Sequence, residues 1–359
     1  MVHAEEVNAP AMERADMRQN PESTVEDAAA IEKLDGDHLF KNMLDVAPQT
    51  QVEYVSSNYA RLPWELEDPD IVFERTALYI ASLKDILDGS TAARMGAEHS
   101  VWAATCSIYF SNLIEGAGLS LSDTHKLCVK ILKGEPVGLE ENRSNSRQSR
   151  TEVLQHAEAF RYLYTEMVTE GKPLDFLILQ ETHRILMTDM VREDGKKVGA
   201  GIFRTEPCNA GQHQFPFPAA IVGSLRWLLH QYNWREHEQD SDPFELAAWL
   251  SYEFVAIHPF DDGNGRMSRL LMNMVLLSRG LAFPVALGFS SGHRQAKQQY
   301  LQCIRNAQAR QGNTNRLATI ILYAYQSVVG SFFENVRLVA PDELPDRLSS
   351  ISKLTAQPR

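Results

Sequence analysis

The sequence predicts an all-α fold with at most one small β-hairpin. Apolar residues recur at three- and four-residue intervals along most of the chain beyond residue 52, which is typical of amphipathic helices. Strand candidates are confined to residues 201–218. With 359 residues, 44% of them hydrophobic, the chain can fill one helical core of roughly 200 residues with appendages. No segment repeats with a period of 20 to 50 residues, which excludes a solenoid.

Three regions are expected along the chain. Residues 1–48 are acidic and poor in large apolar side chains, so we expect a mostly disordered tail there. Residues 49–172 are expected to form a helical region, and residues 173–340 a helical core with C-terminal helices. The polar stretch 134–150 is predicted to be a loop. The tail carries most of the net charge of −12.

Helix ends are marked by capping residues at several places. Ser and Gly bound residues 122–133, and Asp242, Pro243 and Glu245 form a D-x-x-E start with proline at the first helical position. The predicted helices are, in order, 70–87, 97–115, 122–133, 151–170, 174–187, 220–233, 242–257, 266–279, 294–308 and 314–336.

Composition narrows the classes of partner and the compartment. A net charge of −12 argues against general attraction to nucleic acid or anionic membranes. The apolar stretch 317–333 falls short of the ~20 residues that a bilayer needs, so we interpret it as a buried bundle helix. The first residues do not resemble a secretory signal. Four widely spaced cysteines without a C-x-x-C pair are expected to be free thiols in a reducing compartment, which we predict to be the cytoplasm, with the nucleus left open.

The segment 258–269, HPFDDGNGRMSR, departs from ordinary helix punctuation. Pro259 disfavours helical geometry at His258, so this histidine is expected to stand where a helix ends. Two glycines flank Asn264; they allow positive φ and leave backbone N–H groups uncovered at the start of the next helix. Such a helix start attracts phosphate.

Charged residues in the same segment fit phosphate chemistry. Arg266 and Arg269 share a face of the first helical turns, where two cations are unfavourable unless an anion is bound. Asp262 can hold Mg²⁺ together with phosphate oxygens, and His258 can accept a proton near neutral pH. A lone G-N-G is usually a turn, and a lone histidine before proline is usually structural. Their combination within twelve residues predicts a site instead.

This segment resembles the signature of the Fic (Fido) family, H-x-F-x-[D/E]-G-N-G-R-x-x-R, at every specified position. Residues 201–204, GIFR, resemble the family's G-x-[Y/F]-R, with Ala200 where proline is common. The resemblance implies a Fic-type helical bundle with a small β-hairpin flap. It also implies transfer of AMP from ATP to a Ser, Thr or Tyr hydroxyl of a target protein.

The resemblance assigns roles to the residues around the histidine. His258 would be the general base for the target hydroxyl, Phe260 the buried anchor of the loop, and Asp262 the Mg²⁺ ligand. Attack would occur at the α-phosphorus, and pyrophosphate would leave.

The same resemblance assigns the nucleotide contacts. Arg266 and Arg269 would bind toward the β- and γ-phosphates, and Tyr300 falls where the family often places an aromatic ring at the adenine. Three consecutive residues would surround the α- and β-phosphates: Gly263, Asn264 and Gly265.

A second motif lies upstream. Ser111, Glu115 and Gly116 match the family's inhibitory pattern, [S/T]-x-x-x-E-[G/N], which is weak on its own. Glu115 is predicted to pair bidentately with Arg269 and to occupy the place of the γ-phosphate, which would make the enzyme autoinhibited. Glu115 could also assist hydrolysis of AMP from modified targets, and the sequence leaves this direction open.

Residues 212–218 fall at the expected flap. Gln212, His213, Gln214 and Phe215 are predicted to pair with an extended segment of the target near His258. The alternative is a proline-rich surface turn. We interpret His213 as a surface residue of the flap and not as a second base.

The sequence therefore predicts an autoinhibited protein adenylyltransferase that uses ATP and Mg²⁺. The alternatives are a deAMPylase, a bifunctional enzyme, transfer of UMP, phosphate or phosphocholine, and a nucleotide-binding scaffold without activity. The phosphate-transferring variant resembles G-N-K-R at this place, whereas this chain has G-N-G-R. The expected partner is a target protein with an acceptor hydroxyl, and neither nucleic acid nor a membrane is expected. A homodimer is left open.

Overall fold

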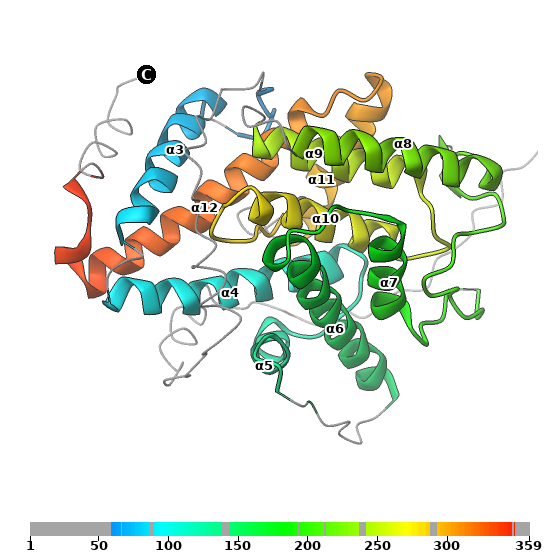
Figure 1. Ribbon diagram of the computed structural model, residues 1–359, viewed down its shortest axis with the longest axis horizontal. Coiled ribbons are helices and arrows are strands. Elements are labelled where there is room, and N and C mark those ends of the chain that lie inside the picture. The colour runs from blue at the N-terminus through cyan, green and yellow to red at the C-terminus, as the bar shows by residue number, and fades with distance from the viewer. Residues whose placement is uncertain are drawn as a thin grey trace, which may run out of the picture. The chain divides into compact units, whose positions relative to one another are not determined.

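Two consecutive helices, α9 (Pro243–Ile257) and α10 (Asn264–Ser278), pack along each other at the centre of the computed structural model (Figure 1). Pro243 and the Asp242 cap begin α9 as predicted, and His258 ends it. The structure describes residues 59–65, 67–86, 90–135, 137, 144–192, 194–211, 213–236, 242–287, 293–346 and 348.

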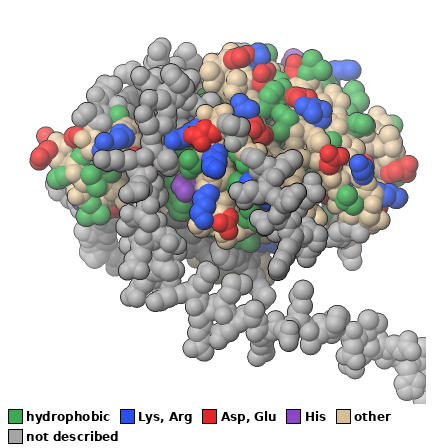
Figure 2. Space-filling view, turned by 90° about the horizontal axis from the view of Figure 1, so that it is seen from below, with side chains coloured by type: hydrophobic (Ala, Val, Ile, Leu, Met, Phe, Trp, Pro, Cys, Tyr) green, Lys and Arg blue, Asp and Glu red, His purple; other side chains and the backbone are tan. Residues whose placement is uncertain are grey.

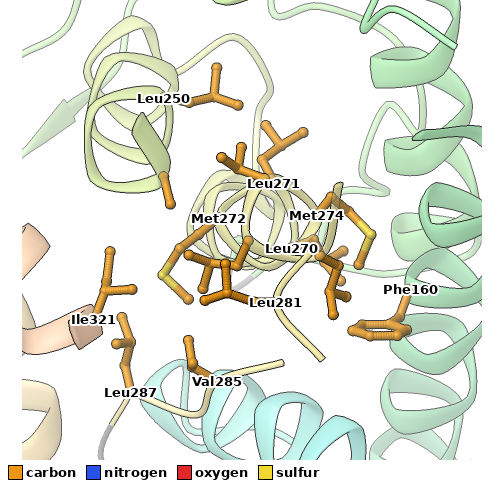
Figure 3. Close-up of a cluster of buried hydrophobic side chains, with 14 of the residues drawn as sticks. Phe160, Leu250, Leu270, Leu271, Met272, Met274, Leu281, Val285, Leu287 and Ile321 are labelled. Atoms are coloured by element: carbon orange, nitrogen blue, oxygen red, sulfur yellow. The ribbon is translucent and has the colours of Figure 1, made fainter. Parts of the chain in front are cut away.

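Helix α10 is buried around most of its circumference, which is typical of a helix at the middle of a core. Leu270, Leu271, Met272 and Met274 point from it in different directions (Figure 3). Side chains from several other segments surround them: Phe160, Leu250, Leu281, Val285, Leu287 and Ile321. The loop before α10 is therefore attached to the most rigid part of the protein.

The remaining helices surround this pair. Their bounds are α3 (Pro69–Ile86), α4 (Ser90–Ile114), α5 (Leu121–Leu132), α6 (Ser144–Leu163), the π-helix η1 (Tyr164–Thr169), α7 (Phe176–Met187), α8 (Pro218–Glu236), α11 (His293–Ala309), α12 (Asn315–Val339) and the 3₁₀-helix η2 (Pro341–Glu343). Helix α12 packs against α3 and α9, and α8 packs against α9. Helices α4, α5, α6 and α7 each pack against the next, and α4 and α6 also contact α10.

The predicted hairpin is present. Strands β1 (Asn209–Ala210) and β2 (His213–Gln214) pair antiparallel, and an isolated bridge between Phe203 and Phe260 joins the preceding segment to the loop after α9. A second isolated bridge, Val191 to Lys197, lies outside the span where strands were predicted. The prediction of an all-α fold with one small hairpin is confirmed.

Several helix starts differ from the predictions, most of all those of α4 and α6. Helix α4 begins at Ser90 and not at 97, and the Glu343 carboxylate accepts the Ala92 N–H of its first turn at 2.8 Å. Helix α6 begins at Ser144, so the predicted loop 134–150 is wrong over its last residues, because a polar first turn carries no apolar periodicity. Helix α10 begins at Asn264, since the glycine after it is helical.

Helix α12 has the length and apolarity to cross a bilayer, the one such helix among the described residues. Half of its most apolar window is buried inside the protein. Buried residues including Leu317, Ile321 and Phe332 line the side that packs on neighbouring helices. This packing agrees with the predicted buried bundle helix.

The other regional predictions have mixed outcomes. The tail 1–48 lies outside the described residues. The predicted boundary at residue 172 falls in the connection between η1 and α7, and all described helices belong to one unit, Gly36–Arg359. All four cysteines are free, as predicted.

On the face seen in Figure 2, acidic and basic side chains are interspersed, with no large area of one sign among the described residues.

We predict that Asp242→Ala lowers the free energy of unfolding by about 2 kcal/mol. The Asp242 carboxylate accepts the backbone N–H groups of Phe244 and Glu245 at 2.8 and 3.3 Å and the Tyr59 hydroxyl at 2.5 Å. Urea titration measures the loss. The control Glu334→Gln breaks an exposed pair with Arg337 and should change stability by less than about 0.5 kcal/mol. Equal effects of the two variants would contradict the assignment.

Candidate active site

The loop between α9 and α10, residues 258–263, begins with a left-handed residue. His258 has φ 52° and ψ 59°, a region that few non-glycine residues adopt. The buried Arg204 holds this turn: its Nε donates to the His258 carbonyl at 2.7 Å, and its Nη2 donates to the Pro216 carbonyl at 2.6 Å. One guanidinium therefore ties the α9–α10 loop to the segment that follows the hairpin.

The His258 ring has a defined orientation and tautomer. It stacks on Phe215 with 3.8 Å between ring centroids and 15° between planes. Nδ1 lies 3.2 Å from the Val255 carbonyl, so Nδ1 carries the proton and Nε2 keeps its lone pair. Burial, assisted by the charge of Arg204, lowers the pKa of His258 to about 4. The ring is therefore neutral at pH 7 and can accept a proton at Nε2.

The middle of the loop is fixed from inside. Phe260 is fully buried and stacks on His183, with 3.6 Å between ring centroids. The Asn264 side chain accepts the Phe260 N–H at 3.0 Å and donates to the Phe260 carbonyl at 2.8 Å. The side chain of Asn264 is thus engaged with the loop, and only its backbone N–H is available to an anion.

His183 on α7 is a residue that the sequence reasoning missed. Its Nδ1 accepts the Gly201 N–H at 2.9 Å, and its Nε2 donates to the Asp262 carbonyl at 2.9 Å. Burial lowers the pKa of this imidazole to about 4. The only signal in the sequence was a histidine among apolar positions of a predicted helix, which does not distinguish such a contact from ordinary packing.

The two glycines of G-N-G serve different purposes. Gly263 has φ 75°, a conformation that glycine allows, and a Cβ there would lie 2.8 Å from the Met187 sulfur. Gly265 is helical and does not use the positive φ that glycine allows; a Cβ there would lie 2.5 Å from Glu115 Oε1. Its backbone N–H belongs to the first turn of α10, whose N–H groups have no partner within the helix.

Asp262 and Arg266 lie beside this turn. The Asp262 side chain is 47% exposed, and its Oδ1 accepts the Gly263 N–H at 2.6 Å. Arg266 is buried 3.9 Å away, and its Nε has no hydrogen-bond partner among the described residues. No group of three acidic, His or Cys side chains that could bind a metal alone occurs in the described part of the chain. One carboxylate beside an anion site fits Mg²⁺ that arrives with phosphate oxygens.

Glu115, directly after α4, contacts the other arginine. Its Oε1 lies 2.6 Å from Arg269 Nη2, a contact through one oxygen where a bidentate pair was predicted. Burial would raise the pKa of Glu115, but the charges of Arg269 and Arg266 outweigh it and the pKa is lowered. Arg269 also donates to the Ser111 hydroxyl and carbonyl at 2.9 and 3.0 Å. Gly116 ends this segment with φ 75°.

The remaining predicted residues are placed as follows. Tyr300 on α11 is buried, with the Arg269 guanidinium carbon 5.5 Å from its ring and its hydroxyl 3.3 Å from Ser268 Oγ; its adenine contact stays a prediction. Gln214 is exposed, and the partly buried His213 meets Phe215 edge-on. Phe215 is buried against His258, so it faces the site and not the surface. Gln212 lies outside the described residues.

Comparison with known proteins identifies relatives of this chain. The model of the Fic/DOC family matches residues 173–276. A Fido domain-containing protein of Dictyostelium discoideum is 37% identical over 144 residues, which cover 39% of this chain and 96% of that protein. "Protein adenylyltransferase Fic" of Nematostella vectensis is 31% identical over 190 residues, 52% of this chain and 40% of the relative. The chain thus spans less than half the length of that adenylyltransferase.

Solved structures show the same fold. A Fic domain containing signaling protein from Bacteroides thetaiotaomicron aligns with a TM-score of 0.56 at 20% identity, over 74% of this chain and 96% of that one. Fic-1 of C. elegans aligns with a TM-score of 0.54 at 21% identity, over 76% of each chain. Together with the match to the Dictyostelium protein along nearly its whole length, these findings show that the chain belongs to the Fic (Fido) family.

Proposed function

We propose that the chain is a protein adenylyltransferase that transfers AMP from ATP to a hydroxyl of a target protein. The observation that carries this proposal is the position of a neutral imidazole, whose Nε2 keeps its lone pair, in the loop that leads into the first turn of α10. The relatives named protein adenylyltransferase Fic, which match about half of the chain, support it.

The residues divide the work of the transfer. The Nε2 atom of His258 accepts the proton of the target hydroxyl while the hydroxyl oxygen bonds to the α-phosphorus. The bond between the α-phosphorus and the oxygen of the leaving pyrophosphate breaks. The N–H groups at the start of α10 and the buried Arg266, whose Nε has no partner in the described structure, stabilise the charge on the phosphates. Asp262 would hold Mg²⁺, which neutralises charge on the phosphate oxygens.

The hairpin offers a docking edge for the target. Gln214 on β2 is exposed, and the next residue, Phe215, stacks on His258. An extended segment paired with β2 would therefore run close to the imidazole. Backbone pairing presents a side-chain hydroxyl without requiring a particular target sequence, so we propose that the hairpin orients the acceptor.

Glu115 is proposed to inhibit this reaction. Its carboxylate lies against the first turn of α10, beside Gly265, and neutralises the buried Arg269. A triphosphate that reached Arg269 would have to displace this carboxylate, because two anions cannot share one guanidinium edge without repulsion. ATP then binds weakly or in an unproductive position while Glu115 stays in place.

A second candidate function is hydrolysis of AMP from a modified target. The lowered pKa keeps Glu115 ionised at neutral pH, and its charge reaches His258. An ionised carboxylate near the imidazole could orient a water molecule toward the phosphorus. Glu115→Gly separates the two candidates, since it should increase transfer but abolish hydrolysis.

We predict that Glu115→Gly increases AMP incorporation at least tenfold, because it frees Arg269 for the nucleotide. Intact-protein mass spectrometry after incubation with Mg-ATP measures added AMP on the protein itself or on lysate proteins. Glu135→Gly is a matched control, since Glu135 also follows a helix end but is exposed, and it should leave incorporation unchanged. Equal incorporation by both variants would remove the inhibitory role of Glu115.

In the Glu115→Gly background, His258→Ala should reduce AMP transfer by at least a hundredfold, since the target hydroxyl loses its base. ATP affinity, measured by calorimetry, should change less than threefold. If ATP binds but neither His258→Ala nor the background protein transfers AMP, the chain is a nucleotide-binding scaffold.

We predict that the His258 ring in the ligand-free protein stays neutral down to about pH 5 and titrates near pH 4. The unfolded chain binds this proton near pH 6.5, so His258 makes the folded state progressively less stable as the pH falls from 6.5 toward 4. NMR of ring ¹⁵N shifts, assigned with His258→Gln, follows the titration. A midpoint near 6.5 would show that the ring is exposed to water.

A further inference from the structure

His183 connects three segments that meet at the site. It lies on α7, its Nδ1 accepts the Gly201 N–H, and its Nε2 donates to the Asp262 carbonyl, both at 2.9 Å. The ring stacks on Phe260 with an angle of 2° between the planes. Because the donor and the acceptor nitrogen are both engaged and the ring face is covered, the imidazole is held in one tautomer and one orientation.

On the side of Gly201, α7 holds the backbone at two points. His183 accepts the Gly201 N–H, and Gln180 Nε2 donates to the Gly201 carbonyl at 3.0 Å. Gly201 has φ 76°, and a Cβ there would lie 3.0 Å from the Gln180 carbonyl oxygen and 3.1 Å from Arg184 Cβ. Glycine is therefore required for this close approach. The same segment continues into Arg204, which holds the His258 carbonyl.

On the side of Asp262, the ring supports the loop directly. His183 Nε2 donates to the Asp262 carbonyl and lies 3.3 Å from where a Cβ of Gly263 would be. The peptide plane between Asp262 and Gly263 is thus fixed by a side chain of another helix. That plane carries the Gly263 N–H, which the Asp262 carboxylate accepts at 2.6 Å, so a rotation there would move or release the acidic group relative to α10.

We infer that His183 is a positioning residue. Its hydrogen bond from Nε2 to the Asp262 carbonyl holds the Asp262 carboxylate where it can bind the magnesium ion of a nucleotide. This inference rests on the proposed function insofar as the nucleotide is Mg-ATP. Packing alone would require an apolar ring of this size, but it would require neither of the two hydrogen bonds.

Two substitutions separate the hydrogen bonds. His183→Gln keeps a donor toward the Asp262 carbonyl and loses the acceptor for Gly201, whereas His183→Asn keeps the acceptor and loses the donor. Both are made in the Glu115→Gly background. Calorimetry then measures the affinity for Mg-ATP and, with EDTA, for metal-free ATP. Gln180→Ala is the matched control, because it loosens Gly201 without touching the loop.

The inference expects a selective loss. His183→Asn should weaken Mg-ATP binding at least tenfold and metal-free ATP binding less than threefold, while His183→Gln and Gln180→Ala stay within threefold for both. In an Asp262→Ala background, His183→Asn should have no further effect on the magnesium dependence. The inference would be overturned if both His183 variants lost ATP affinity equally, in proportion to the fall in their melting temperatures, and if magnesium still increased ATP affinity as much as before.

A measurement on the unsubstituted side chain covers the case that the variants do not fold. The proton on His183 Nε2 should give a slowly exchanging NMR signal that shifts when Mg-ATP is added to the Glu115→Gly protein and shifts less with ATP and EDTA. Equal shifts in the two additions would contradict the inference. If Glu115→Gly transfers no AMP although these binding results hold, the proposed function fails and the role of His183 stands.

Discussion

The neutralisation of Arg269 is the interaction on which the arrangement of the site depends. This guanidinium is 4% exposed at the middle of α10, and a buried charge without a partner is strongly destabilising. Ser111 and Glu115 supply its partners from the end of α4, more than 150 positions earlier in the chain. An anion at this place therefore stabilises the buried guanidinium, whether it is the protein's own carboxylate or a phosphate.

The loop before α10 is rigid because its backbone groups are held by side chains from other segments. Arg204 holds the His258 carbonyl, His183 holds the Asp262 carbonyl, and Asn264 holds both backbone groups of Phe260. Each of these contacts satisfies a polar group that burial would otherwise leave unpaired. The reactive side chains are thus carried on a backbone that cannot rearrange without breaking several hydrogen bonds at once.

Local signals predicted the fold class and much of the site. Asp242, Pro243 and Pro259 predicted the ends of α9, and the twelve-residue segment predicted which groups lie near one another. Contacts between distant segments were beyond such signals. The His183 imidazole is chemically indistinguishable from a core histidine until the fold places it under Asp262. The stacking of Phe215 on His258 likewise depends on where the hairpin lies, which no local pattern encodes.

The stack of Phe215 on His258 links the hairpin to the basicity of the imidazole. Burial is the largest cause of the low proton affinity of this ring, and Phe215 is part of what covers it. If an incoming polypeptide displaced Phe215 without covering the ring again, water would reach the imidazole and its proton affinity would rise toward that of free histidine. The proton affinity of His258 therefore depends on which surface covers the ring. Binding of the acceptor and the ability of the ring to take up a proton are physically linked.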